Sequence, residues 1–488
     1  MRAVVALCLL LGAQPAAAAG AKATDPPSVL LITIDTLRRD RLGCYGSSSC
    51  ETPHLDALAR TGTLFETVVT SAPTTAPSHA TMMTALSPRA HGVLANGQTL
   101  APHAATLAEA LRDAGYATGA FVSSAVLARR AGLDRGFDDY IEAYSRAGTR
   151  QSVSSAESTN AHAIPWLRAH AREPFFLWVH YYDPHQPYEA PGVLGEYADA
   201  GYAGAMPEWD DNQVRDWIRS GDAPAEETRH LRARYDAEVA YVDAQVGALL
   251  AALDATGAQA RTLVCVTSDH GETLGEHAGY FGHSHQLYDT TLLVPLIVSL
   301  PGRLPARGIV AAPARLLDLA PTLLAILERA PLANVEGRSL LAIGAGMNTG
   351  ARSDVRGHDA THAIDDEVVG SPSLAVSETH PSDRPGPDVN VIPRKLSMRS
   401  AEGKLIRWLD SDSLEVFDLA RDPGETRNLA ADAGARTSAA SDDGGAAALT
   451  TRLSERLAAW EKAIGAALSL EPLDEETRER LRSLGYID

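Results

Sequence analysis

The sequence predicts an α/β fold with a mostly parallel central sheet, helices on both of its faces, and a smaller C-terminal α+β domain. Two observations support this fold class. Short apolar runs that end in polar residues alternate with helical patterns, which is typical of parallel sheets covered by helices. After about Leu332 the composition shifts towards Gly, Ser, Asp and Pro. We therefore expect one domain over residues 25–331 and a second domain over residues 332–488.

Apolar runs rich in β-branched residues define the predicted strands, which are residues 28–34, 118–122, 175–182 and 262–267. Helical patterns lie between them, most clearly at residues 105–114 and 233–255. Ligands of such sheets bind where the parallel strands end. Several polar residues follow the predicted strands and should meet at that edge: Asp35, Asp183, Asp269 and His270. One aspartate after a strand is usually a turn or cap residue, whereas several of them with a histidine indicate a metal site.

The C-terminal part has a different texture. Residues 343–391 are rich in turn formers and are predicted to be mainly loops, and residues 430–447 are predicted to be a flexible excursion. Two short strands are expected at residues 404–409 and 414–419. Residues 449–484 carry heavy i to i+4 charge pairing, which predicts a helix.

The overall charge excludes one class of partner. The chain has 488 residues, with 43 Lys and Arg against 62 Asp and Glu, which gives a formal charge of -19. No basic surface for nucleic acid is expected from this balance. A small anionic substrate therefore needs a local positive site, most naturally a metal ion.

The first 19 residues have the features of a secretory signal peptide. One Arg precedes an apolar run over residues 4–12, and small residues follow in the pattern of a cleavage site. The run is too short to span a bilayer, because Gln14 and Pro15 interrupt it. We expect a periplasmic or secreted protein without stable membrane insertion.

The cysteines provide no metal site. Cys265 lies in an apolar run and is expected to be a buried thiol, whereas Cys44 and Cys50 could close a short loop if they were oxidised. Without a zinc-type cysteine pattern, any metal ion must be held by Asp, His and hydroxyl ligands.

The stretch "TTAPSHATMM", residues 74–83, contains several hydroxyl groups next to a proline that opens a helical run. Taken alone, it favours an ordinary helix cap over a nucleophile, because Ser and Thr side chains accept the unpaired amides of a first turn.

Five segments together resemble the sulfatase family of the alkaline phosphatase superfamily, in their order and approximate spacing. They are "LLITIDTLRRDRLGCYG", "TPHLDALARTGTLFETV", "TAPSHATMMTALSPRAHGV", "VTSDHGETLGEHAGYFGH" and "EVFDLARDPGETRNLA". The resemblance covers most of residues 29–300 and the region 417–429. It implies an alkaline phosphatase-like fold and a metal-dependent hydrolase that acts on ester bonds.

The resemblance also implies one divalent metal ion held by Asp35, Asp269 and His270, with Thr75 completing the site. Carboxylate oxygens and one imidazole independently suit Ca²⁺, Mg²⁺, Mn²⁺ or Zn²⁺. Thr36 stands where the family often has a second Asp. An alternative is a second metal ion held by further polar residues: Asp183, His185, His283 and His285.

Sulfatases convert a Cys or Ser at the start of a Cys/Ser-x-Pro-x-Arg motif to formylglycine, and the matching positions here are Thr75 and His79. Oxidation of a threonine would give a ketone, so no formylglycine is expected. The nucleophile should then be the alkoxide of Thr75, activated by a metal ion at a helix N-terminus. Thr74 is the rival hydroxyl, and Thr74 or Ser78 would be the helix-start hydroxyl.

The remaining assignments follow the same resemblance. His79, His185 and His283 are predicted to be catalytic, with His283 and His285 near the position of a family lysine. Residues predicted to bind the substrate are Asn96, His180 and His285.

A threonine nucleophile favours phosphate or phosphonate esters as substrates, because water can attack a phospho-threonine in line at phosphorus. Two alternatives remain open: a sulfuric ester hydrolase that works without formylglycine, and a non-catalytic protein that binds anionic glycans or lipid head groups. A transferase would resolve the same intermediate with an alcohol.

Overall fold

The computed structural model describes residues 26–144, 153–197, 201–206, 208–341, 374–380, 394–431 and 443–464. The predicted signal peptide, residues 1–19, lies outside these ranges, so export stays a prediction. No helix in the described ranges is long and apolar enough to cross a membrane.

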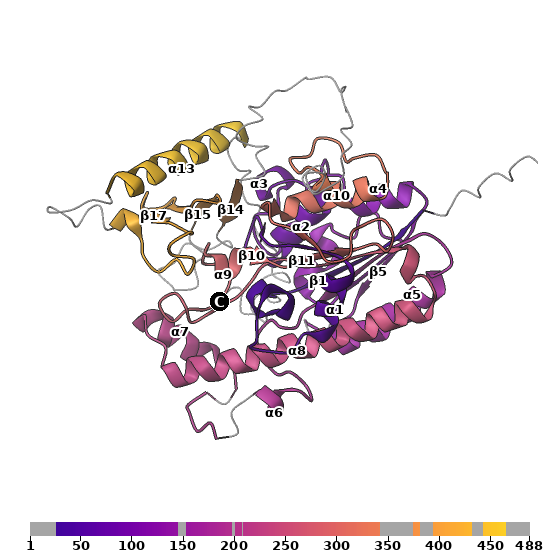
Figure 1. Cartoon of the computed structure of the whole chain (residues 1–488), viewed down its shortest axis with the longest axis horizontal. Coiled ribbons are helices and arrows are strands. Elements are labelled where there is room, and N and C mark those ends of the chain that lie inside the picture. Colours follow the sequence, from indigo (N-terminus) through magenta and orange to yellow (C-terminus); the bar gives the residue numbers. More distant parts are fainter. Residues whose placement is uncertain are drawn as a thin grey trace, which may run out of the picture.

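A central sheet organises the larger part of the molecule (Figure 1). Its strands in the described residues are, in spatial order, β12 (Gly308–Val310), β2 (Thr63–Phe65), β11 (Leu296–Ser299), β7 (Thr262–Ser268), β1 (Ser28–Ile34), β6 (Phe175–Tyr181), β4 (Ala117–Val122) and β5 (Asp139–Glu142). From β7 to β5 every neighbouring pair is parallel, whereas β11 is antiparallel to both of its neighbours. The predicted α/β class with a mostly parallel sheet is confirmed.

Helices cover both faces of this sheet because its central strand buries side chains on both sides. In β1, Val29 and Leu31 pack into one core, while Leu30, Ile32 and Ile34 pack into the other. The first core is covered by α2 (Thr75–Thr84), α4 (Leu107–Asp113) and α10 (Leu319–Ile326). The second is covered by α1 (Pro53–Thr61), α5 (Ala156–His170) and α8 (Ala225–Ala255), which lie on the opposite side in Figure 1.

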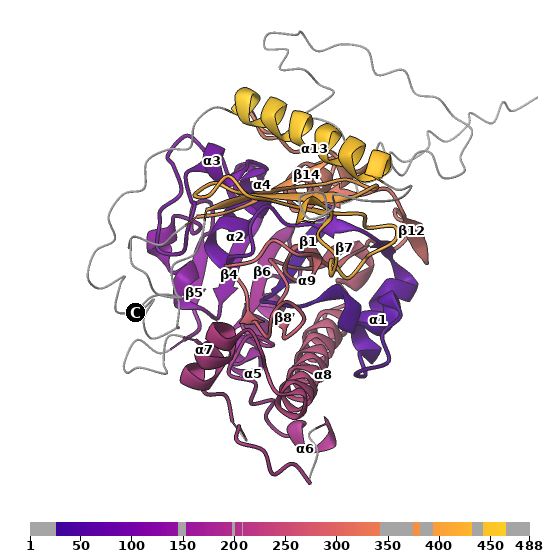
Figure 2. The same ribbon diagram turned by 90° about the vertical axis from the view of Figure 1, so that its left-hand side faces the viewer.

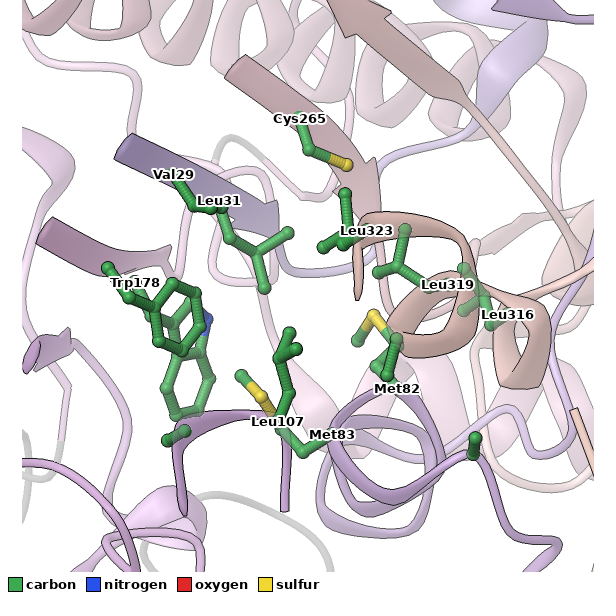
Figure 3. Packing of buried hydrophobic residues seen from close by; sticks show 14 of the residues in the cluster. Val29, Leu31, Met82, Met83, Leu107, Trp178, Cys265, Leu316, Leu319 and Leu323 are labelled. Carbon is green, nitrogen blue, oxygen red and sulfur yellow. The ribbon is translucent and has the colours of Figure 1, made fainter. Parts of the chain in front are cut away.

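The first core fixes the position of α2. Figure 3 shows Met82 of this helix towards Leu319 of α10 and Met83 towards Leu107 of α4 and Trp178 of β6, in the core that also holds Leu31. All ten residues of α2 are buried. The N-terminus of α2 is thereby held at the edge where β1 and β7 end.

We expect Leu31→Ala to lower the free energy of unfolding by about 2–5 kcal/mol, because the side chain is fully buried in this core and its removal leaves a cavity. Denaturant titration measures the change. Ile309→Ala is the control, since this side chain is 49% exposed and should cost less than about 1 kcal/mol. A similar loss in both variants would contradict the packing described here.

Shorter elements complete the larger part. The short strands are β3 (Val68–Val69), β8 (Thr273–Leu274), β9 (Phe281–Gly282), β10 (Leu293–Val294) and β13 (Ala314–Arg315). The short helices are α3 (Pro88–His91), α6 (Leu194–Tyr197), α7 (Asp211–Ser220) and α9 (Asp289–Leu292), with 3₁₀ turns η1 (Arg39–Arg41), η2 (Gly43–Tyr45), η3 (Ala125–Leu127), η4 (Arg129–Ala131), η5 (Gln259–Arg261) and η6 (Leu316–Asp318).

The C-terminal part contains an antiparallel sheet, in the order β14 (Ala375–Thr379), β15 (Lys395–Arg399), β16 (Lys404–Trp408) and β17 (Leu414–Phe417). Helix α13 (Asp443–Ile464) packs across one face of it, as Figure 2 shows. The other face packs against β10 and the segment before it, through Phe417, Leu287 and Leu293. A buried Lys404 ties the two parts together, because its Nζ lies 2.5 Å from Asp289 Oδ1.

The sequence-based boundaries need three corrections. Strand β14 lies inside residues 343–391, which were predicted to be mainly loops. It was missed because its short run "AVSET" carries few apolar residues. Helix α13 begins at Asp443, inside the predicted flexible excursion. Helix α8 begins eight residues earlier than predicted, since its first turns are largely charged and show little apolar periodicity. The domain boundary near residue 332 stays a prediction.

Candidate active site

Asp35, Asp269 and His270 meet where two neighbouring strands end. Strands β1 and β7 pair in parallel with Ile34 opposite Ser268, so the residues that follow them are adjacent. One ligand atom from each of the three side chains lies within 4.8 Å of the others, and all three are fully buried. Among the described residues no other group of three or more such side chains has this geometry.

These residues fit a divalent metal ion. Both carboxylate oxygens of Asp35 and Oδ2 of Asp269 are buried without a hydrogen-bond partner. Burial raises the pKa of Asp35 well above its ordinary value, and the charges of Asp269 and Glu272 raise it further. Buried carboxylates without partners are costly unless a cation neutralises them. Their ion pairs in the described chain are all with histidines, so no lysine or arginine neutralises them.

Two backbone amides hold one carboxylate oxygen of Asp269, Oδ1. Its Oδ1 accepts hydrogen bonds from the amides of His270 at 2.8 Å and Thr36 at 3.3 Å. Thr36 has φ of +55°, a left-handed conformation that is unusual for threonine. The Thr36 hydroxyl is buried without a hydrogen-bond partner among the described residues. Because threonine stands where the family often has a second Asp, this position supplies no carboxylate. Oδ2 of Asp269 remains for a metal ion.

Thr75 is the first residue of α2 and stands beside this cluster. Its Oγ1 lies 3.5 Å from Nε2 of His270, and the side chain is fully buried. Asn96 accepts the amide of Ala76 through Oδ1 at 2.9 Å, which fixes the orientation of its side-chain amide. The Nδ2 group of Asn96 is buried without a partner. A hydroxyl, a metal-type cluster and a hydrogen-bond donor are therefore gathered at one helix N-terminus.

The predicted helix-start hydroxyls behave differently. Thr74 occupies the N-cap position, but its side chain makes no capping hydrogen bond; Oγ1 instead lies 3.5 Å from the hydroxyl of Ser284. Ser78 donates to the backbone carbonyl of Asp269 at 2.7 Å. Capping by either side chain was therefore wrong, because the Thr74 hydroxyl faces Ser284 after β9 and the Ser78 hydroxyl bonds to Asp269 after β7.

Backbone partners determine which nitrogen of each histidine carries a proton. A carbonyl only accepts, so the contact of Nδ1 with Gly271 O (3.0 Å) in His270 places the proton on Nδ1. In His185, Nδ1 lies 2.8 Å from Gln186 O and 2.6 Å from the Tyr182 hydroxyl. That hydroxyl donates to Gln186 O at 3.0 Å, so it can accept from the same Nδ1–H. Nε2 of each ring then presents a lone pair. This is the form in which an imidazole binds a metal ion or accepts a proton.

His79 has partners on both ring nitrogens. Nδ1 donates to Thr75 O at 2.8 Å, and Nε2 lies 3.1 Å from the hydroxyl of Thr33. Burial lowers the pKa of His79, so the ring is a neutral replacement for the arginine of the family motif. Its contacts suit support of Thr75 better than direct contact with a substrate.

His185 and His283 lie together near His270. The ring centroids of His185 and His283 are 4.9 Å apart, and those of His270 and His283 are 4.4 Å apart. Burial lowers the pKa of His185 to about 4 and that of His283 well below its ordinary value. Nδ1 of His283 lies 3.3 Å from Oε1 of Glu272, a buried carboxylate that the sequence analysis overlooked.

His285 and Asp183 lie outside this arrangement. His285 pairs through Nδ1 with the hydroxyl of Tyr280 at 2.8 Å, and its carbonyl accepts from Lys395 at 2.8 Å. Asp183 accepts the amide of Ala156 at 2.7 Å, at the beginning of α5. Asp183 is thus engaged as a helix-start residue, and the second metal site gains no support from the described residues.

The cysteines of the described residues are free thiols. Cys265 is a buried thiol in β7, as predicted, and Cys44 and Cys50 are both free thiols. Cys50 donates to the carbonyl of Arg41 at 3.2 Å.

The protein has an alkaline phosphatase-like fold. Its buried metal-type cluster lies beside a helix N-terminus, at the edge where the parallel strands end. The solved structure of a 2-O GAG sulfatase has this fold: the TM-score is 0.68 at 22% identity, with 93% of this chain and 96% of that chain covered. The phosphonate monoester hydrolase of Agrobacterium radiobacter is equally similar, with a TM-score of 0.69 at 22% identity and coverages of 92% and 98%.

Sequence comparison identifies the family. The model of the sulfatase family matches residues 27–328, more than half of the chain, so this chain belongs to the sulfatase family. Iduronate 2-sulfatase of Mus musculus is 28% identical over 366 residues. That match covers 62% of this chain and 65% of the mouse protein, so the chain spans slightly less than two thirds of this relative.

Proposed function

We propose that this protein is a metal-dependent hydrolase that cleaves phosphate or phosphonate esters through a covalent intermediate on Thr75. The observation that carries the proposal is the position of the Thr75 hydroxyl, buried beside Asp35, Asp269 and His270 at the N-terminus of α2. Asp35, Asp269, His270 and Thr75 would hold one divalent ion. When bound, this ion would lower the pKa of the threonine hydroxyl and neutralise charge on the transferring group.

In the first step, Thr75 Oγ1 gives its proton to water and forms a bond to phosphorus, while the bond from phosphorus to the ester oxygen breaks. The electron pair of that bond leaves with the ester oxygen, which takes up a proton. Burial lowers the pKa of His283 in the free protein, so His283 can donate this proton only after the negative charge of a bound ester raises its proton affinity. Its Nδ1 lies 3.3 Å from Oε1 of Glu272, and His283 is the candidate donor on this ground. Asn96 Nδ2 donates a hydrogen bond to a non-bridging oxygen, which would give this buried donor a partner.

In the second step, water attacks phosphorus and the bond from phosphorus to Thr75 Oγ1 breaks. The Nε2 lone pair of His185 accepts the proton of this water, because its Nδ1 proton is fixed on Gln186 O. The threonine oxygen takes a proton from water, which replaces the one given up in the first step, and the phosphate or phosphonate is released. His185 passes its proton to solvent, from which His283 regains the one it donated.

A sulfuric ester hydrolase is the second candidate, and membership of the sulfatase family favours it. Sulfate esters and phosphonate monoesters both present a tetrahedral anion with one ester oxygen to displace. They differ in the second step, since a threonine sulfate ester lacks the elimination route that formylglycine provides. We therefore rank the phosphorus esters first.

A comparison of three substrates tests the proposal. The metal-loaded protein is assayed for kcat/KM on an aryl phosphodiester, an aryl phosphonate monoester and an aryl sulfate. We expect at least one phosphorus ester to exceed the sulfate by about tenfold or more, a difference of about 1.4 kcal/mol in transition-state stabilisation. A preference for the sulfate would support the second candidate, and no turnover of any ester would support the non-catalytic alternative.

A further inference from the structure

His180 is a fully buried histidine that the proposed chemistry does not use. It lies near the end of β6, opposite Thr33 of the neighbouring strand β1, and Asp35 directly follows that strand. Its Nε2 is buried without a hydrogen-bond partner. Oδ2 of Asp35 lies 3.7 Å from this nitrogen.

Ser123, which follows β4, determines the proton position of His180. The backbone amide of Ser123 points at Nδ1 of His180 from 3.4 Å, and its hydroxyl lies 2.9 Å from the same nitrogen. An amide N–H can only donate, so Nδ1 is the acceptor and the neutral ring carries its proton on Nε2.

The Nε2 proton makes His180 different from its neighbour His270. In His270 the proton is on Nδ1, held by Gly271 O, and Nε2 is a lone pair 3.8 Å from Oδ1 of Asp35. In His180 the nitrogen that faces Oδ2 of Asp35 is a donor. A protonated nitrogen cannot bind a metal ion. The two histidines therefore differ, because His270 presents a lone pair near Oδ1 of Asp35, whereas His180 presents an N–H near Oδ2.

We infer that Ser123 and His180 are positioning residues that hold the carboxylate of Asp35 for the metal ion. The hydroxyl of Ser123 donates to Nδ1, so Nε2 of His180 carries a proton 3.7 Å from Oδ2 of Asp35. This contact is longer than a hydrogen bond, and we expect it to shorten when an ion binds on the side of Oδ1. His180 itself lies outside the group whose ligand atoms are mutually close, consistent with a role through Asp35. The inference rests on the proposed metal site. It assigns His180 a role other than the substrate contact expected from sequence.

Removal of the Ser123 hydroxyl should weaken metal binding. Without it, Nδ1 keeps only the longer amide contact, and the ring can move its proton to Nδ1, which would point a lone pair at Asp35. Outer groups that orient metal ligands typically contribute 10- to 100-fold in affinity. We therefore expect Ser123→Ala to raise the dissociation constant for the metal ion by about 10- to 100-fold.

The experiment measures the affinity of the full-length protein for Mn²⁺, Zn²⁺, Ca²⁺ and Mg²⁺ by competition with a chelator, together with Tm with and without each ion. Ser124→Ala is the matched control, because Ser124 is the next residue, is equally buried, and its hydroxyl has no hydrogen-bond partner. Ser123→Thr restores a hydroxyl and should restore most of the affinity. His180→Gln retains an N–H donor at the ε position and should bind more tightly than His180→Phe.

The outcomes separate this inference from the proposed function. Weaker metal binding and a smaller metal-induced rise in Tm for Ser123→Ala, with normal values for Ser124→Ala, support the inference. Normal metal affinity in Ser123→Ala overturns it alone. An equal loss of Tm with and without metal, at unchanged affinity, also overturns it, because that pattern indicates a purely structural role. A wild-type protein that binds none of the four ions overturns the proposed metal site and this inference with it.

Discussion

Replacement of Thr75 by valine is expected to reduce kcat by about 10³-fold or more on every ester that the protein cleaves. Valine has nearly the same shape as threonine, so the fully buried first turn of α2 should stay packed. The variant lacks the oxygen that would form the covalent bond to phosphorus. Steady-state kinetics on the preferred ester measures the loss, and equal Tm values for variant and wild type exclude unfolding as its cause.

Two further variants test whether the lost oxygen is the nucleophile. Thr75→Ser retains a hydroxyl and should keep kcat within about tenfold of the wild type. Thr74→Val removes the rival hydroxyl, whose contact in the structure is Ser284 Oγ at 3.5 Å, and should leave kcat nearly unchanged. If Thr74→Val abolished turnover while Thr75→Val retained it, the assignment would pass to Thr74.

The metal cluster could be predicted from sequence because its residues occupy local positions. Asp35, Asp269 and His270 directly follow apolar strands, and parallel strands end at a common edge. This reasoning also grouped Asp183 with them, and it was the resemblance to the sulfatase family that singled out Asp35, Asp269 and His270. The register of β1 and β7 in the structure places them as this reasoning requires.

Residues that support the cluster were harder to predict because their contacts cross strand pairs. Ser123 and His180 are separated by 57 positions, and nothing in the sequence near Ser123 indicates a histidine partner. Glu272 does carry a local signal, since it follows His270 by two residues in "DHGE". Its contact with His283 depends on the turn between β8 and β9, which the sequence pattern did not specify.

The capping assignments for Thr74 and Ser78 failed for a related reason. Local rules correctly indicated a helix start at this stretch, and α2 begins at Thr75. They could not anticipate that Ser284 and the carbonyl of Asp269, about 190 to 210 residues away, would take these hydroxyls. Tertiary hydrogen bonds overrode the local preference.

The buried Lys404 is a similar case in the C-terminal part. Its strand reads as amphipathic, and a lysine at its beginning is expected to be exposed. Instead its Nζ lies 2.7 Å from Glu425 and 2.5 Å from Asp289, which precedes β10. The pairing depends on the docking of two sheets, so sequence periodicity could not reveal it.

Asp269→Asn is expected to remove the metal ion and to reduce kcat/KM by about 10³-fold. Asparagine can still accept the amides of His270 and Thr36 through Oδ1, so the turn after β7 should keep its shape. Its Nδ2 group replaces Oδ2, the oxygen that is buried without a partner beside Nε2 of His270 at 3.4 Å. An amide donor in that position presents protons to the metal site instead of a negative charge. We therefore expect the variant to contain less metal than the wild type and to be as stable as the metal-free wild type.

Metal analysis of the purified variant, with Tm of the chelator-treated wild type as reference, measures this expectation. Asp183→Asn is the matched control, because Asp183 also follows a central strand but accepts the amide of Ala156 at 2.7 Å, a bond that asparagine can replace. It should retain the metal content of the wild type. A second equivalent of metal in the wild type that disappears in Asp183→Asn would instead establish the two-metal alternative, in which Asp183 leaves its helix-start role to bind an ion. Full metal content and activity in Asp269→Asn would mean that the ion is bound elsewhere. Protons, not a cation, would then neutralise the unpartnered oxygens of this buried cluster.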